Sequence, residues 1–169
     1  MRYRLDVIGD NVTDLVSSAG GWIYDRQAAG WDVNVVLPEG ADLRPLRILG
    51  ARAQTIDALG RGLRGLGPRP NALATSVTLC ATDPWVSAQI AQAMQEGTTE
   101  ITLWGDQWPS SIVGPRGPVS HRLSVAGRAF KAQALAAVGE SPLTVGKCEV
   151  FRTASTAPSW VGADLIPAG

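Results

Sequence analysis

The chain has 169 residues, the length of one ordinary domain, and its 15 Lys and Arg balance 15 Asp and Glu, so the formal net charge is zero. A domain of this size buries roughly 70% of its unfolded surface without disulfides or metal, and zero net charge argues against whole-chain attraction to nucleic acid or anionic membranes. Two cysteines give no disulfide framework, no secretory leader is evident, and the apolar runs fall short of the roughly 20 residues that cross a bilayer, which predicts a cytoplasmic protein.

The first 38 residues have the pattern of a βαβ unit. They predict a strand at Arg2–Gly9, a helix from about Asn11 to Ala29 and a strand at Asp32–Leu37. The apolar residues of the helix recur at spacings of three and four and share one face: Val12, Leu15, Val16, Ala19, Trp22 and Ile23. Because parallel strands need a crossover of this length, we expect the rest of the chain to extend the same sheet.

The middle of the chain predicts a second βαβ unit. Residues 43–50 fit a helix or a short strand, and an apolar stripe predicts a helix at Arg52–Arg64, which ends at the Gly- and Pro-rich segment 65–70. Ala72–Ala81 is nearly uncharged and rich in β-branched residues, which is typical of a central strand. Asp83 and Pro84 then open a helix that leads to a strand at Glu100–Trp104.

The last third contains the longest irregular stretch, Gln107–Ser120, a length that is uncommon unless a loop is functional. A helix at His121–Val138 and a strand at Leu143–Phe151 follow. We therefore expect one α/β domain at residues 1–152 and a C-terminal tail at 153–169 that is either frayed or pinned by its apolar residues. The predicted architecture is a three-layer sandwich around a mostly parallel five-stranded sheet, Rossmann-like or flavodoxin-like, with an undetermined strand order.

Ligands of such folds bind outside the carboxyl ends of the strands. The residues at those positions, together with Arg116 of the long loop, are the candidate ligand- or partner-binding residues: Asp10, Asn11, Glu39, Asp83, Trp85, Asp106, Gln107, Trp108 and Arg116. Trp85 and Trp108 also have the character of interface anchors, since exposed tryptophans commonly anchor partners.

Two alternatives involve chemistry or a cofactor at the same edge. The acids could hold Mg²⁺ for a hydrolase or phosphotransferase, although Asp10 and Asp83 also suit helix capping and Asp106 suits a turn. The tryptophans could flank a nucleotide or flavin, but the turn Gly9–Asp14 carries two acids where a phosphate cradle is expected, and GxGxxG is absent.

Catalytic signatures are missing from the sequence. His121, the one histidine, falls at a predicted helix start, which is typical of a surface or capping residue, and neither cysteine has a context that would activate it. No GxSxG elbow occurs. We therefore assign no catalytic residue, metal ligand or cofactor, and predict a non-enzymatic protein that binds a protein partner, a second copy or a small ligand, without nucleic-acid or membrane partners.

Overall fold

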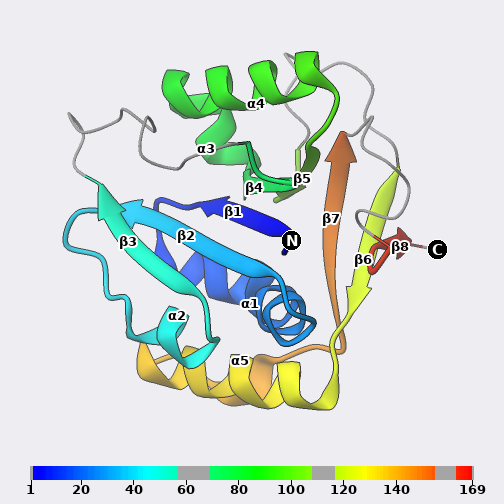
Figure 1. The fold of residues 1–169 in the computed structure, drawn as a ribbon. Helices are drawn as coiled ribbons and strands as arrows, with labels where there is room; N and C mark the ends of the chain where they lie inside the picture. The colour runs from blue at the N-terminus through cyan, green and yellow to red at the C-terminus, as the bar shows by residue number, and fades with distance from the viewer. Residues whose placement is uncertain (1, 57–68, 108–116, 155–162, 169) are drawn as a thin grey trace.

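A single mixed β-sheet runs through the molecule between two layers of helices (Figure 1). The computed structural model describes residues 2–56, 69–107, 117–154 and 163–168, and within them the sheet has eight strands in the order β3-β2-β1-β4-β5-β7-β6-β8. The strands are β1 (Arg4–Ile8), β2 (Asp32–Pro38), β3 (Arg52–Ile56), β4 (Ala72–Ser76), β5 (Glu100–Trp104), β6 (Pro118–Arg122), β7 (Cys148–Ala154) and β8 (Ile166–Pro167). The helices are α1 (Val12–Ala28), α2 (Arg44–Ile48), α3 (Val77–Thr82), α4 (Pro84–Glu96), α5 (Val125–Ala137) and the 3-10 turn η2 (Pro142–Thr144).

The sheet has a parallel part and an antiparallel part. Strands β3, β2, β1, β4 and β5 are neighbours in parallel, whereas β7 pairs antiparallel with β5 and β6, and β8 pairs antiparallel with β6. The predicted α/β class is confirmed. The predicted five-stranded, mostly parallel sheet is wrong, because the described sheet has eight strands and β7, β6 and β8 add antiparallel pairs at the β5 edge.

The alternation of side chains along the strands produces two apolar layers. Leu5 and Val7 of β1 face the layer with α1, α2 and α5, which is also filled by Trp22 and Phe151. Ile8 faces the layer with α3 and α4 on the other side of the sheet (Figure 1). A period of two along a strand therefore gives both layers their cores.

Local signals account for the predicted helices that are confirmed. Asn11 precedes α1, and its side-chain oxygen accepts a 2.9 Å hydrogen bond from the backbone N–H of Asp14. The turn after α1 contains Gly30 at a φ of 94°, a conformation that favours glycine. Asp83 caps α4, and Gly97 ends that helix in the left-handed conformation. The predicted strand at Glu100–Trp104 is β5.

The predicted central strand at Ala72–Ala81 is wrong in its second half. β4 is central but ends at Ser76, whose hydroxyl oxygen accepts a 3.0 Å hydrogen bond from the backbone N–H of Leu79 and caps α3. A local side-chain cap thus overrides the β-branched composition. Cys80 is consequently buried in a helix, and Cys148 lies exposed at the start of β7.

Two segments that were predicted as the starts of helices belong to strands instead. Residues 52–56 of the helix predicted at Arg52–Arg64 form β3, which pairs in parallel with β2, and residues 57–68 lie outside the described part of the chain. The segment 43–50, left open between helix and strand, contains α2. The helix predicted from His121 begins only at Val125, because Pro118–Arg122 pairs with β7 and Ser124 caps α5. His121 is therefore a buried strand residue, not a surface or capping one.

The end of the chain also differs from the predicted pattern. The strand expected at Leu143–Phe151 is replaced by η2 followed by β7, which extends to Ala154. Beyond it, β8 joins the sheet next to β6, and the division into a domain at 1–152 and a tail at 153–169 stays a prediction. Among the described residues, no helix is both long and apolar enough to cross a membrane.

A buried ion-pair network links α1 to the sheet and to the C-terminal segment. Arg26 of α1 is 2% exposed, and its Nη2 lies 3.1 Å from Oε1 of Glu100 and 2.8 Å from Oδ1 of Asp164. Its guanidinium carbon also lies 4.3 Å from the ring centroids of both Trp22 and Trp31. The network thus joins α1, β5 and the C-terminal segment.

Candidate functional site

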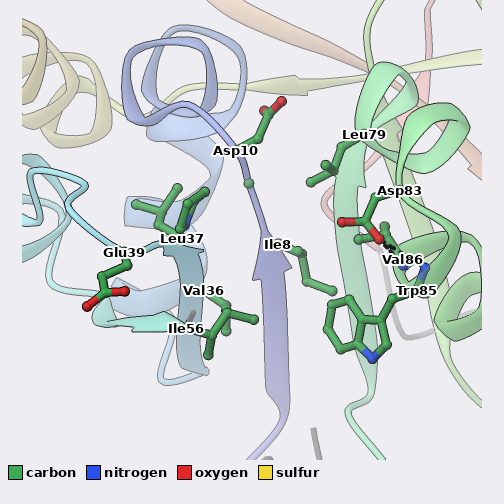
Figure 2. A pocket seen from close by; sticks show the side chains of 12 residues that line it. Ile8, Asp10, Val36, Leu37, Glu39, Ile56, Leu79, Asp83, Trp85 and Val86 are labelled. Atoms are coloured by element: carbon green, nitrogen blue, oxygen red, sulfur yellow. Dashed lines mark hydrogen bonds between the residues drawn. The ribbon is translucent and has the colours of Figure 1, made fainter. Parts of the chain in front are cut away.

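A pocket opens at the carboxyl ends of the parallel strands (Figure 2). It has a volume of about 380 Å³ and lies between the ends of β1, β2 and β3 on one side and the α3–α4 region on the other. Its lining consists of Ile8, Gly9, Asp10, Val36, Leu37, Pro38, Glu39, Ile56, Leu79, Asp83, Trp85 and Val86.

The strand order explains why the pocket is at this position. From β1 the chain crosses through α1 to β2 on one side, whereas β4 lies on the other side of β1. Connections that leave neighbouring strands in opposite directions form a topological switch point, where open α/β sheets bind ligands. The pocket is lined from both sides of that point.

Close packing after β1 determines the path of the chain to Asp10. A Cβ atom at Gly9 would lie only 2.7 Å from Cδ1 of Leu15 and 3.2 Å from Cδ2 of Leu37. The backbone N–H of Gly9 donates a 3.0 Å hydrogen bond to the carbonyl oxygen of Val36. A side chain at this position would force Leu15 to shift, and the next residue, Asp10, is exposed and lines the pocket.

The opposite wall is built by the start of α4. Oδ1 of Asp83 accepts hydrogen bonds from the backbone N–H groups of Trp85 at 2.9 Å and Val86 at 3.3 Å. This cap fixes the first turn of α4, in which Trp85 is half-buried and Val86 is buried. Figure 2 shows the indole of Trp85 beside Ile8, across the pocket from Ile56. The wall therefore depends on a carboxylate that is itself part of the lining.

The structure brings four of the predicted binding residues together, namely Asp10, Glu39, Asp83 and Trp85. Three others, Asn11, Asp106 and Gln107, are not part of the lining that the described residues form. Asn11 caps α1, Asp106 and Gln107 are exposed after β5, and Trp108 and Arg116 lie outside the described residues. That the four lining residues bind a ligand stays a prediction.

Sequence reasoning missed the apolar part of the lining. Leu79 was assigned to a strand and Ile56 to a helix, so neither was expected at a strand end. Ser76 is a residue type that favours the N-cap position, which is a weak signal for the correct start of α3. Val36 carried no signal of its own, because an apolar residue near the end of a strand is common.

Comparison with known proteins gave structural matches only. No family model matches the chain, and no curated protein matches it in sequence. The fold resembles the A40926 pseudoaglycone deacetylase Dbv21, at a TM-score of 0.63 and 16% identity over 94% of this chain and 100% of that one. It also resembles the zinc-inhibited form of the teicoplanin deacetylase Orf2, at a TM-score of 0.59 and 13% identity over 89% of this chain and 97% of that one. The N,N'-diacetylchitobiose deacetylase from Pyrococcus horikoshii matches at a TM-score of 0.57 and 11% identity over 90% of this chain and 84% of that one.

These likenesses establish the fold and correct the functional interpretation. The prediction of a non-enzymatic binding protein is wrong, because these three structures with the same fold are those of deacetylases, and they favour the alternative prediction of a hydrolase. They do not support the Rossmann-like or flavodoxin-like comparison either. At 11–16% identity, the fold says nothing about which residues act.

The zinc-inhibited form of Orf2 raises the question of whether this chain has donors for such an ion. In the part of the chain that the structure describes, no group of three or more His, Cys, Asp or Glu side chains could hold a metal ion. His121 lies in β6 with its Nε2 2.7 Å from Oδ2 of Asp25, outside the pocket lining. The described donor set therefore does not fit a metal centre, including the Mg²⁺ site considered from the sequence.

Proposed function

We propose that this chain is a hydrolase that cleaves a small acyl amide bound in the pocket at the β1–β4 switch point, with Asp10 as the general base. The observation that carries the proposal is the position of Asp10: it follows β1 directly and lines a pocket where this class of fold binds ligands. The likeness to three deacetylases supports hydrolysis of an amide as the reaction class.

Asp10 is suited to accept a proton. It is exposed, and within the described residues no hydrogen bond or ion pair engages its carboxylate. In the proposed reaction, a water oxygen bonds to the amide carbonyl carbon while Asp10 accepts a proton from that water. The C–N bond then breaks as the proton passes from Asp10 to the leaving nitrogen, and a carboxylic acid and an amine are released, which exchange a proton to become a carboxylate and an ammonium ion. Positioned general bases contribute about 10²- to 10⁴-fold to such rates.

The other lining residues would hold the substrate. Asp83 already accepts two backbone hydrogen bonds from α4, so its structural task is to keep Trp85 in place. Trp85 and the apolar side chains Ile8, Val36 and Ile56 offer contact area for the non-reacting part of a small ligand. This division assigns the chemistry to one side of the pocket and substrate contact to the rest.

The test compares wild-type protein with Asp10→Asn on a panel of small N-acetyl amines, with acetate release followed by proton NMR. We expect acetate from at least one amide and a loss of about 100-fold or more in Asp10→Asn. Glu140→Gln, an exposed acid after α5 on the other face of the sheet, is the matched control and should retain wild-type rates. Absence of acetate with every amide, or full activity in Asp10→Asn, would contradict the proposal.

A further inference from the structure

The single histidine of the chain lies where the C-terminal segment, residues 163–168, meets the rest of the molecule. His121 of β6 is 7% exposed. Its Nε2 lies 2.7 Å from Oδ2 of Asp25 in α1. Its Nδ1 lies 3.2 Å from the backbone carbonyl oxygen of Asp164 and 3.8 Å from Oδ2 of the same residue. The two ring nitrogens therefore face two different elements, and the ring connects α1 to the C-terminal segment.

Both partners of the ring are hydrogen-bond acceptors. A backbone carbonyl oxygen cannot donate, and Oδ2 of Asp25 already accepts a 2.9 Å hydrogen bond from the backbone N–H of Ser124. The Ser124 hydroxyl donates to the other oxygen of that carboxylate. A neutral imidazole has one N–H group and one nitrogen lone pair, so either tautomer turns a lone pair towards an acceptor. Only the imidazolium form donates to both partners, and the geometry around His121 is that of a protonated ring.

Charged groups surround the ring on each described element that packs against it. They are Asp25 and Arg26 of α1, Lys131 of α5, Glu149 of β7 and Asp164 of the C-terminal segment, with the exposed Arg122 next along β6. Arg26 pairs with Asp164, and Lys131 pairs with Glu149, which is the cross-strand neighbour of His121. Asp25 forms its ion pair with the ring itself. The surroundings therefore favour a positive charge on His121.

The C-terminal segment is attached to the sheet at few points. Leu165 packs against the core, whereas both residues of β8, Ile166–Pro167, are exposed. β8 is the edge strand next to β6 (Figure 1). Beyond it, the backbone N–H of Ala168 donates a 2.9 Å hydrogen bond to the carbonyl oxygen of Pro118. Segments with few buried apolar contacts open at low free energy, so a single hydrogen bond changes how often such a segment is released.

We propose that His121 is a proton-dependent clasp for the C-terminal segment. As an imidazolium, the ring donates from Nε2 to Asp25 and from Nδ1 to the carbonyl oxygen of Asp164. After loss of one proton, the remaining N–H faces the Asp25 carboxylate, and the lone pair of Nδ1 then faces the carbonyl oxygen. The segment is therefore held firmly while the ring is charged and loosens as the pH rises through the titration of the ring. Because His121 is not part of the described pocket lining, the clasp is independent of the proposed hydrolysis.

The test follows the ring and the segment in one pH titration of the ¹⁵N-labelled full chain by NMR. A single histidine gives one pair of ring nitrogen signals, which show when the ring loses a proton and from which nitrogen. Amide exchange of Ala168, corrected for its intrinsic pH dependence, reports docking. The matched control is the amide of Leu123, which donates a 2.9 Å hydrogen bond to Lys147 on the other side of β6. We expect the proton to leave Nδ1 and the protection of Ala168 to fall about 3- to 10-fold over the same pH range, with Leu123 unchanged.

Two variants separate the clasp from a general loss of stability. His121→Gln cannot titrate, so the protection of Ala168 should stay at its low value throughout. Asp25→Asn keeps an oxygen that accepts from Ser124 but removes the carboxylate, so both the ring titration and the loosening should move to lower pH. Constant protection of Ala168 while the wild-type ring titrates, or the same pH-dependent loosening in His121→Gln, would overturn the inference. If His121→Gln does not fold, the other two proteins decide, because in each of them the ring and the segment must respond at the same pH.

Discussion

Arg26 of α1 and Asp164 of the C-terminal segment, 138 positions apart in the sequence, form an ion pair with a distance of 2.8 Å between Nη2 and Oδ1. The same Asp164 carboxylate accepts a 2.8 Å hydrogen bond from the indole N–H of Trp22. The same Nη2 of Arg26 also lies 3.1 Å from Oε1 of Glu100 of β5. One buried cation therefore faces two carboxylates, and these differ in how they respond to pH.

The free energy of unfolding of Glu100→Gln should increase relative to that of wild type as the pH rises. Burial raises the pKa of Glu100 above its usual value of 4.5, although Arg26 and Thr102 oppose the shift. The folded state thus keeps this proton to higher pH than the unfolded chain, so wild type loses stability as the pH rises through the folded pKa. Urea unfolding between about pH 4 and pH 7 should show the free-energy difference moving towards the variant. A constant difference would contradict this assignment.

Asp164→Asn should show the opposite behaviour. Burial acts to raise the pKa of Asp164, but hydrogen bonds and charge from Arg26, with His121 and Trp22, outweigh it and lower the pKa below 3.8. The stability from this carboxylate is present above the unfolded pKa and is lost as the pH falls through the folded one. The same urea titrations should find the variant less stable by about 1 kcal/mol or more at neutral pH, with the deficit shrinking only in acid. A deficit that grows in acid would refute the prediction.

Gly21→Ala should destabilise the protein, although alanine favours helices. A Cβ atom at this position of α1 would overlap the side chain of Leu123, and overpacking of this kind costs roughly 1–3 kcal/mol. The neighbouring Gly20→Ala is the matched control, because its Cβ would lie 3.2 Å from Cγ1 of Val16, which a small shift relieves. Thermal unfolding of both variants gives the comparison, and equal melting temperatures would show that Leu123 moves aside freely.

Phe151→Ala should cost about 3–5 kcal/mol of unfolding free energy. The Phe151 side chain is 1% exposed, and its ring centroid lies 4.9 Å from that of Trp22, so its removal leaves a cavity between β7 and α1. Val150→Ala, at the preceding residue, which is 57% exposed, should change stability by no more than about 0.5 kcal/mol. Chemical denaturation measures both values. Similar losses in the two variants would mean that β7 does not pack in this way.

Chelation should leave the stability of the folded chain unchanged. A metal ion held at a hundred times its Kd would add about 2.7 kcal/mol, and the described residues contain no group of donors for one. The melting temperature should therefore be the same after dialysis against EDTA and after addition of Zn²⁺ or Mg²⁺. A clear rise with either ion would reveal a site that the described residues do not form.

The sequence predicted best those elements that carry their own boundary signals. Asn11 and Asp83 cap helices through contacts within a few residues, so α1 and α4 were predicted within one or two positions. β3 was mistaken for the start of a helix, and β6 for the end of the long loop and the start of the next helix, because only pairing with β2 and β7 makes them strands. The apolar residues around β3 also have a helical spacing, so no local feature marks it as a strand.

The difference between local signals and long-range pairing also explains how much of the candidate site could be predicted. Strand ends could be found from the sequence, which placed Asp10 and Glu39 on the correct edge. The strand order could not, and it decides which strand ends meet. Asp106 follows β5, two strands away from β1 and beside the antiparallel part of the sheet, so it is not part of the pocket lining. The sequence therefore gives the candidate residues at the strand ends, and the strand order determines which of them lie together.

The place of β7 between β5 and β6 has a consequence for synthesis of the protein. On the ribosome, the parallel strands β1 to β5 emerge first, but β6 finds its neighbour only after Cys148–Ala154 has left the exit tunnel. Until then one edge of β5 is unpaired, Trp22 lacks Phe151, and Arg26 lacks Asp164. The nascent chain thus carries an open edge of β5 and an incompletely paired cation until β7 and Asp164 have been synthesised.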